Sequence, residues 1–362
     1  MTSTEPKTVA VTGANGYIGA HVCAGLLDAG LKVRACVRDP GNAQKVSFLK
    51  KIAEAKGAAD RLELFRGDLL DEGSYAPAFE GADVVVHTAA VVDLSGGNAQ
   101  NTIDAAVIGT TNVMACARSS KSVRRLVNVS SVSAIMDASK ADDHVFTEAD
   151  WNNYSTVETG DPYGYAKVTS ERLFWKEAKA AGLEAVSINP AMVIGPALHP
   201  SHCKGTLGPL CWLLVGGGEN PPEKAPSWKI YHCPLRMVDV RDVAKACVRA
   251  ALSDHEGVLG RRHLLANDSA PKTFAQLLPD LQRLFPKYAL AVPPEEPKTE
   301  AEAPEDTSSF YKKYVSRTGP IYDNAYSKEF LMREGYLSME DSLAQSIETM
   351  VSLGVQPNLA SS

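Results

Sequence analysis

Thr8-Val-Ala-Val-Thr-Gly-Ala-Asn-Gly-Tyr-Ile-Gly19 reads as a buried strand, a tight glycine turn and the start of a helix. The helix continues with apolar residues at helical spacing, Val22, Leu26 and Leu27. Glycines let a backbone approach a pyrophosphate, and a helix start adds unpaired N–H groups and the positive end of the helix dipole. The stretch therefore predicts the first unit of a dinucleotide-binding α/β fold.

The glycines of this stretch are spaced Gly-x-x-Gly-x-x-Gly, at Gly13, Gly16 and Gly19. This spacing departs from the Gly-x-Gly-x-x-Gly fingerprint of dinucleotide-binding folds. The alternative is a purely structural glycine turn that binds no ligand. The context favours phosphate binding, because the turn follows a buried strand and opens a helix.

A second strand, expected over residues 32–37, is followed by Arg38, Asp39 and Pro40. An acidic residue at the tip of this strand binds the ribose hydroxyls of NAD, whereas a cation accommodates the extra phosphate of NADP. Arg38, and Lys45 on the helix that should follow, therefore favour NADP(H). Two alternatives stay open: Asp39 could turn toward a ribose, and both cations could be solvated surface charges.

Short apolar strands alternate with helices along the rest of the first half of the chain. Strands are expected at residues 62–65, 83–87, 125–129 and 184–189, and helices at 102–117 and 161–181. This order predicts an α/β fold with a Rossmann-type doubly wound parallel sheet. Ligands bind at the carboxyl ends of such strands, so Asp68, Thr88 and Ser131 should share one edge. His87, inside its strand, is expected to be a core residue.

The chain changes character after Pro190-Ala-Met-Val-Ile-Gly-Pro196, a segment whose prolines predict that it leaves the sheet. Helices are expected at residues 239–252, 273–284 and 339–353, strands at 229–231 and 262–266, and a solvated loop at 293–306. We expect an NAD(P)-binding domain over residues 1–195. Residues 196–362 should form mainly a smaller substrate lobe, with segments that return to the sheet.

Composition excludes several classes of protein. The net charge of −6 speaks against a nucleic-acid partner, which would require a basic face. No apolar run reaches the length of a membrane span. Seven cysteines without a Cys-x-x-Cys pair fit reduced thiols. A cytoplasmic enzyme, monomeric or homodimeric, is the expectation.

The cluster His199-Pro-Ser-His202-Cys203 carries the ligand types of zinc. Pro200 and the lack of a spaced partner pair make it a poor match, so no metal site is predicted. We expect this segment to form a loop over the substrate cleft.

Asp161-Pro-Tyr-Gly-Tyr-Ala-Lys167 carries the candidate chemistry. Tyr163 and Lys167 are four residues apart and share one face of the expected helix. A nearby cation favours the phenolate, which makes a phenol a usable acid at neutral pH. A solvated aromatic beside a solvated charge is the alternative. Tyr163 is the only tyrosine with lysine at this spacing; Tyr165 has Thr169 there.

Together these motifs resemble the extended short-chain dehydrogenase/reductase superfamily. The resemblance rests on Thr12–Gly19, Asp68-Leu69, His87-Thr-Ala-Ala90, Val129-Ser-Ser131, Tyr163–Lys167 and Asn189–Pro196, in this order. The chain is most similar to the dihydroflavonol 4-reductase and cinnamoyl-CoA reductase group, through Val33–Pro40 and Met237–Ala244. The resemblance spans nearly the whole chain and thins in the C-terminal lobe.

The resemblance implies an NADPH-dependent reductase that transfers hydride to a ketone or aldehyde of a fairly large apolar or aromatic substrate. Tyr163 would protonate the carbonyl oxygen, and Lys167 would strengthen that acid and bind the nicotinamide ribose. Ser131 would hydrogen-bond the same oxygen, with Ser130 and Ser133 as alternatives. Ala106 stands where many short-chain enzymes have asparagine, which puts a proton relay through that position in doubt.

The resemblance also implies which residues bind the cofactor. They are Gly13, Gly16, Tyr17, Ile18 and Gly19 at the pyrophosphate, Arg38 and Lys45 at the 2′-phosphate, Asp68 and Leu69 at the adenine, Thr88, Ala89 and Ala90 at the next strand end, and Pro190 to Val193 at the nicotinamide carboxamide. The pair Tyr163 and Lys167 also belongs to the cofactor-binding set.

Three other functions stay open. They are an NAD-dependent 3β-hydroxysteroid-type dehydrogenase, a nucleotide-sugar epimerase, and a nucleotide-sensing regulator without catalysis. Arg38 in place of an acidic residue speaks against the epimerase, and the intact Ser, Tyr and Lys set speaks against the regulator. Specificity would be set near Ile135, Tyr154, residues 198–203 and residues 210–215, and the sequence does not name the substrate.

Overall fold

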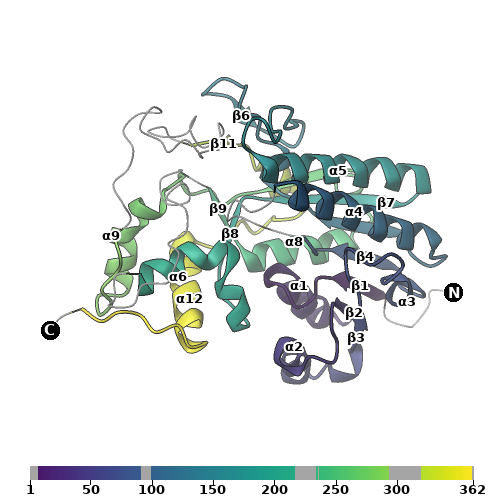
Figure 1. The fold of residues 1–362 in the computed structure, drawn as a ribbon, viewed down its shortest axis with the longest axis horizontal. Coiled ribbons are helices and arrows are strands. Elements are labelled where there is room, and N and C mark those ends of the chain that lie inside the picture. The colour runs from purple at the N-terminus through teal and green to yellow at the C-terminus, as the bar shows by residue number, and fades with distance from the viewer. Residues whose placement is uncertain (1–6, 91–98, 217–233, 235, 293–318, 361–362) are drawn as a thin grey trace.

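A parallel sheet of seven strands forms the centre of the protein (Figure 1). The computed structural model describes residues 7–90, 99–216, 234, 236–292 and 319–360. The strands lie in the order β10 (Arg262–Leu265), β7 (Glu184–Pro190), β5 (Arg125–Val129), β4 (Val84–His87), β1 (Thr8–Thr12), β2 (Lys32–Val37) and β3 (Leu62–Arg66). The strand order reverses between β1 and β4, which confirms the predicted doubly wound α/β fold.

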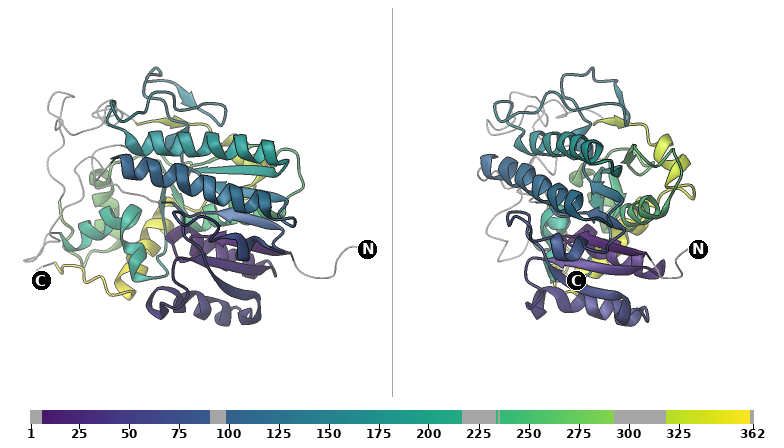
Figure 2. Two further views of the ribbon diagram at one scale, coloured as in Figure 1. Left: turned by 45° about the vertical axis from the view of Figure 1, so that its right-hand side comes forward. Right: turned by 90° about the vertical axis from the view of Figure 1, so that its right-hand side faces the viewer.

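Helices cover both faces of this sheet. One face carries α1 (Tyr17–Asp28), α2 (Ala43–Ala55) and α8 (Val240–Leu252), and the other carries α3 (Ala76–Phe79), α4 (Ala99–Ser119) and α5 (Pro162–Ala181). Side chains alternate along β1, so that Val9 and Val11 enter one core and Ala10 the other. Helices α4 and α5 lie side by side in Figures 1 and 2.

Local signals set the bounds of α5, the helix that carries the Tyr163 motif. The Asp161 carboxylate accepts a hydrogen bond from the Gly164 N–H at 3.0 Å and caps the helix. Pro162 occupies the first turn, where its missing N–H is not needed. Gly182 ends the helix with a left-handed φ of 65°. Tyr163 is therefore held within one turn of a capped helix start.

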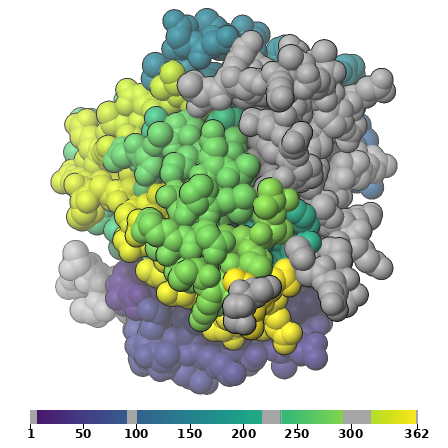
Figure 3. Space-filling view, turned by 90° about the vertical axis from the view of Figure 1, so that its left-hand side faces the viewer, coloured from purple at the N-terminus to yellow at the C-terminus, as the bar shows by residue number. Residues whose placement is uncertain are grey.

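The chain leaves the central sheet after β7, as its prolines predict. β8 (Met192–Ile194) pairs with β9 (Met237–Asp239) in a separate sheet. Near it, α6 (Gly208–Val215), α9 (Phe274–Leu284) and α12 (Met339–Ser352) share a third core. Figure 3 shows that residues 236–292 and 319–360 lie next to each other on this end of the surface.

The remaining elements are short. β6 (Val145–Phe146) pairs with β11 (Ile321–Tyr322), and α11 (Ala325–Phe330) follows β11. Single turns of 3₁₀ helix lie at η1 (Ala59–Arg61), η2 (Val132–Ala134), η3 (Pro200–Cys203) and η4 (Gly205–Leu207). The strand expected at residues 229–231 and the loop expected at 293–306 lie outside the described residues. No helix in the described ranges has the length and apolarity to cross a bilayer.

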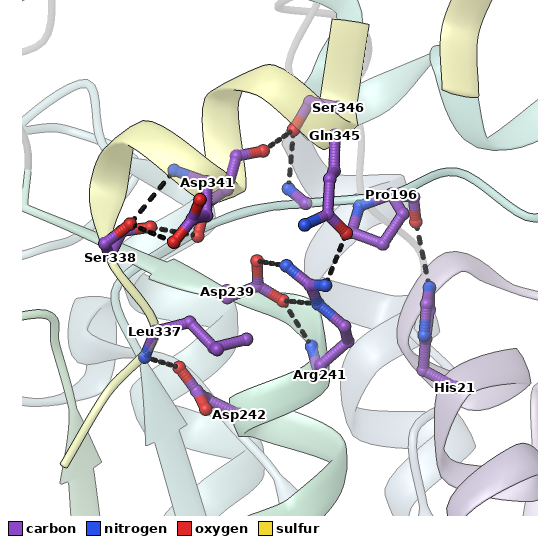
Figure 4. A network of polar contacts seen from close by, with 12 residues as sticks. His21, Pro196, Asp239, Arg241, Asp242, Leu337, Ser338, Asp341, Gln345 and Ser346 are labelled. Carbon is purple, nitrogen blue, oxygen red and sulfur yellow. Dashed lines mark hydrogen bonds and ion pairs between the residues drawn. The ribbon is translucent and has the colours of Figure 1, made fainter. Parts of the chain in front are cut away.

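Hydrogen bonds from α1 and from α12 hold the segment that directly follows β8 (Figure 4). From α1, the Tyr17 hydroxyl donates to the Gly195 carbonyl at 2.8 Å and His21 Nε2 donates to the Pro196 carbonyl at 2.9 Å. From α12, the Ser346 hydroxyl accepts from the Gly195 N–H at 2.8 Å. Arg241 joins Asp239 of β9 to α12 through Gln345. The lobe is thus fixed to the helix that opens with the glycine turn.

The free energy of unfolding should depend on pH through His263, a fully buried residue of β10. Its Nε2 donates to the Val258 carbonyl, and burial lowers the pKa of His263 to about 4. In the unfolded chain the imidazole titrates near about 6.5. The folded pKa is the lower one, so this stabilisation is present above about pH 6.5 and lost as pH falls toward 4, by about 1.4 kcal/mol per pH unit. Urea unfolding of His263→Leu between pH 7.5 and 4.5 should show a shallower pH dependence than the wild type; an unchanged slope would contradict this assignment.

Candidate active site

The carboxyl ends of the parallel strands bring the predicted site residues to one edge of the sheet. In register, Thr12 lies beside His87 and His87 beside Asn128. Gly13, Thr88 and Ser130 directly follow the last residues of β1, β4 and β5. This edge contains the point where the strand order reverses, the position at which such sheets bind ligands.

A hollow at this edge contains Tyr163 and Lys167, and we call it the Tyr163 hollow. Its walls come from the loop after β3, the ends of β4 and β5, and helices α4 and α5: Leu69, His87, Ala89, Ala90, Ala105, Ala106, Thr110, Asn128, Val129, Ser130, Tyr163, Ala166, Lys167 and Ser170. The ammonium of Lys167 lies 5.8 Å from the centre of the Tyr163 ring. The ammonium and the aromatic ring are therefore neighbours on one face of α5.

His87 is buried, as predicted, but it also lines the Tyr163 hollow. Its Nδ1 lies 2.7 Å from the Thr12 hydroxyl oxygen. Burial, and then the charge of Lys167, lower the pKa of His87 to about 4, so that the imidazole is neutral at pH 7. Thr110 and Asn128 line the same hollow and were not predicted. One signal was available for Asn128, since it interrupts the apolar strand Leu126-Val-Asn-Val129.

The three candidate serines differ in their partners. Ser130 lines the hollow, but its hydroxyl donates to the buried Glu171 carboxylate at 2.6 Å. The Ser131 hydroxyl donates to the Ser133 hydroxyl at 3.2 Å and accepts from the Ser133 N–H at 3.1 Å. Ser131 therefore caps the short helix η2 and does not itself line the hollow. Among the described residues, no carboxylate accepts from the hydroxyl of Ser131 or Ser133.

The glycine turn is packed too closely for side chains. Gly13 has a left-handed φ of 67°, and a Cβ there would lie 2.8 Å from Ala89 Cα. A Cβ on Gly19 would lie 2.2 Å from the Gly13 oxygen and 2.7 Å from the Thr88 hydroxyl. No side chain caps α1 at Gly16, so the N–H groups of its first turn remain for a ligand. This uncapped helix start fits a pyrophosphate.

Tyr17 and Ile18 point their side chains away from this helix start. The Tyr17 hydroxyl is held by Gly195, and Ile18 packs on the core beneath the sheet. Their backbone N–H groups alone are positioned for the role predicted for them.

Asp68 and Leu69, predicted at the adenine, lie in the loop after β3. The Asp68 carboxylate accepts from the Leu70 N–H at 3.0 Å, and the Leu69 carbonyl accepts from Asn112.

Arg38 and Lys45 lie at the tip of β2 and on the first turns of α2. Both side chains are exposed, and neither forms an ion pair with any described residue. One carboxylate oxygen of Asp39, Oδ1, accepts a hydrogen bond from the Gly41 N–H at 3.0 Å. Asp39 therefore does not have both oxygens available to bind a ribose. Two cations without a carboxylate partner suit a phosphate.

The residues predicted for the nicotinamide lie on two strands. Pro190 ends β7 beside Leu265, and Val193 pairs with Val238 in the small sheet. Both are buried. The amide of Asn189, directly before Pro190, donates to the Ser131 carbonyl at 3.1 Å. The end of β7 is therefore joined to residues 130–133 after β5, which we call the serine loop.

The segment His199–Cys203 is placed differently from the prediction of a loop over the substrate cleft. His202 Nε2 donates to the Asn15 carbonyl at 3.1 Å, and His199 Nε2 to the Gln44 carbonyl at 2.9 Å. The His199 ring stacks on Phe48 of α2, and burial lowers the pKa of His202 to about 4. The two imidazoles are donors to carbonyls of the glycine turn and α2, which explains their position. Among the described residues, no three metal-ligating side chains cluster.

Known proteins resemble this chain over most of its length. Residues 9–263 match a family described as the NAD dependent epimerase/dehydratase family. Cinnamoyl-CoA reductase CAD2 of Medicago truncatula is 31% identical over 353 residues, covering 95% of either chain. Dihydroflavonol 4-reductase of Arabidopsis thaliana is 36% identical over 202 residues, 54% of this chain and 52% of that protein. The solved structure of Gre2 from Candida albicans in complex with NADPH has the same fold, with a TM-score of 0.75 at 24% identity over 96% of this chain and 100% of that one.

Proposed function

This chain is an oxidoreductase that belongs to the NAD dependent epimerase/dehydratase family, and from that membership we propose that it is an NADPH-dependent carbonyl reductase. It reduces a ketone or aldehyde of a fairly large apolar or aromatic substrate to an alcohol. The observation that carries the proposal is the Tyr163–Lys167 pair in a hollow beside the glycine turn. The 31% identity to a cinnamoyl-CoA reductase over nearly the whole chain supports the substrate class.

The proposed chemistry divides between the cofactor and the protein. A bound nicotinamide supplies the hydride, and the protein orients the carbonyl and stabilises charge on its oxygen. Tyr163 donates its phenolic proton to that oxygen, and the Lys167 ammonium stabilises the phenolate that results. Ser131 donates the second hydrogen bond, for which its hydroxyl turns from Ser133 to the substrate oxygen.

The proposed cofactor is NADPH rather than NADH. The cations Arg38 and Lys45, which form no ion pair within the described part of the chain, support this choice, since a guanidinium and an ammonium are strong phosphate ligands. The NADPH bound by Gre2 of Candida albicans belongs to that protein and agrees with the choice. The uncapped start of α1 would hold the pyrophosphate, and residues 196–362 are proposed to supply most of the substrate contacts.

A panel of carbonyl compounds tests the proposal. Absorbance at 340 nm is followed with NADPH and with NADH against aryl aldehydes and ketones, dihydroflavonols, acyl-CoA thioesters and 3-ketosteroids. We expect oxidation of NADPH with at least one aryl carbonyl, and slower oxidation of NADH. No turnover with any compound would refute a reductase. Tightly retained NAD with turnover of a UDP-sugar would indicate an epimerase instead.

A further inference from the structure

A buried carboxylate lies one helical turn beyond Lys167. Tyr163, Lys167 and Glu171 follow one another at four-residue spacing on α5 and therefore share a face of the helix. Glu171 is fully buried. A buried carboxylate needs partners, and its partners show what it holds together.

The Glu171 carboxylate contacts three strands. Its Oε2 accepts from the Ser130 hydroxyl at 2.6 Å after β5 and from the Asn189 amide at 2.8 Å on β7. Its Oε1 accepts from Arg262 Nε at 2.7 Å on β10 and from Trp175 Nε1 at 3.3 Å on α5 itself. One side chain of the helix thereby joins the carboxyl ends of β5 and β7 to the first residue of β10.

The ionised form of Glu171 is the one that this network requires. All of its contacts come from donors. Burial alone would raise the pKa of Glu171, but Arg262 and the hydrogen bonds from Ser130 and Asn189 hold it below its ordinary value. Because the carboxylate and the Ser131 carbonyl both accept from Asn189 Nδ2, the orientation of that amide is determined as well.

Arg262 anchors the network to the loops around it. Besides Glu171, its guanidinium donates to the carbonyls of Ala134, Glu148 and Asp150, and it lies 3.9 Å from the centre of the Trp151 ring. Ala134 belongs to η2, which Ser131 caps. Glu171 and Arg262 therefore both contact the segment after β5, Glu171 at Ser130 and Arg262 at Ala134.

We propose that Glu171 is a positioning residue, which sets the distance between the acid on α5 and the serine and nicotinamide segments at the ends of β5 and β7. This inference rests on the proposed function. Glu171 holds Tyr163 and Lys167 through their common helix, Ser131 through Ser130 and Asn189, and Pro190 through Asn189. It does not touch the reacting atoms.

The test separates positioning from stability. Glu171→Gln removes the charge and turns an amide donor toward Arg262 or Asn189. The matched control is Arg125→Met, at the opposite end of β5, where a buried guanidinium pairs with Glu184 at 2.7 Å away from the hollow. Both proteins are compared with the wild type at a temperature where circular dichroism shows them folded. The readouts are the single-turnover rate of NADPH oxidation with cinnamaldehyde and the dissociation constant of NADPH by fluorescence.

The expected result is a fall of about tenfold or more in the single-turnover rate of Glu171→Gln, with the NADPH dissociation constant changed less than threefold. Arg125→Met should lower the melting temperature and leave the rate within twofold. A rate for Glu171→Gln within threefold of the wild type overturns the proposal. If Glu171→Gln does not fold, Arg262→Lys is measured in its place under the same criterion. A wild-type protein that oxidises NADPH with no carbonyl of the panel refutes the proposed function instead.

Discussion

Tyr163→Phe is expected to lower turnover by about two orders of magnitude or more and to leave NADPH binding unchanged, as for removal of a general acid. The substitution keeps the ring, which lies 5.8 Å from the Lys167 ammonium, and removes only the hydroxyl. The helix itself should persist, because its cap is made by Asp161 and Gly164. Steady-state turnover with saturating NADPH and cinnamaldehyde measures the loss.

Tyr165→Phe is the matched control for this prediction. Tyr165 lies on the same helix two residues later and therefore points to another side of it. It is not among the residues that line the Tyr163 hollow. Turnover of Tyr165→Phe should stay close to that of the wild type. Equal turnover of the wild type and Tyr163→Phe would rule out the assigned acid.

Arg38→Ala should weaken NADPH by about tenfold to a hundredfold and leave NADH nearly unchanged. A hydrogen bond to a charged group contributes about 1.5–3 kcal/mol, which corresponds to this loss of affinity. Arg38 has no carboxylate partner among the described residues, so its removal leaves no protein charge unpaired. Lys45→Ala should act in the same direction with a smaller loss, since an ammonium binds phosphate without the paired geometry of a guanidinium. Titration of each variant with both cofactors by fluorescence gives the four dissociation constants.

Lys56→Ala is the control for the two cations. Lys56 follows the opposite end of α2 and forms an ion pair with Asp28 at 2.6 Å. Its removal should change neither dissociation constant. Equal weakening of NADPH and NADH by Arg38→Ala would show that the guanidinium does not read the extra phosphate.

The bounds of the central elements followed closely from local patterns. β1, β2 and β5 begin and end at the expected residues, and α5 differs from its prediction by one residue. Helix α4 begins three residues earlier than expected, at Ala99, and ends two residues later, at Ser119. These agreements have a local cause, because strand patterning, capping by Asp161 and the left-handed Gly182 act over a few residues.

Contacts between distant segments were beyond the reach of sequence patterns. The loop at His199 was expected over the substrate cleft, yet it contacts Asn15 and Gln44, which lie far away in the chain. Thr110 had no motif that would place it beside Tyr163, and the polar Asn128 in an apolar strand did not show which residue it would face. Such neighbours arise only when strands take their places in the sheet.

The sequence alone determined the α/β fold, the glycine turn before α1, the Tyr163–Lys167 spacing on one helical face and the pair of cations after β2. Each depends on backbone rules or helical periodicity over at most a few turns. Tertiary structure decided which serine hydroxyl is held by a carboxylate, where the Tyr17 side chain points, and that Glu171 joins α5 to β5, β7 and β10. Those outcomes depend on burial, because a buried polar group binds whichever donor or acceptor the packed chain brings to it.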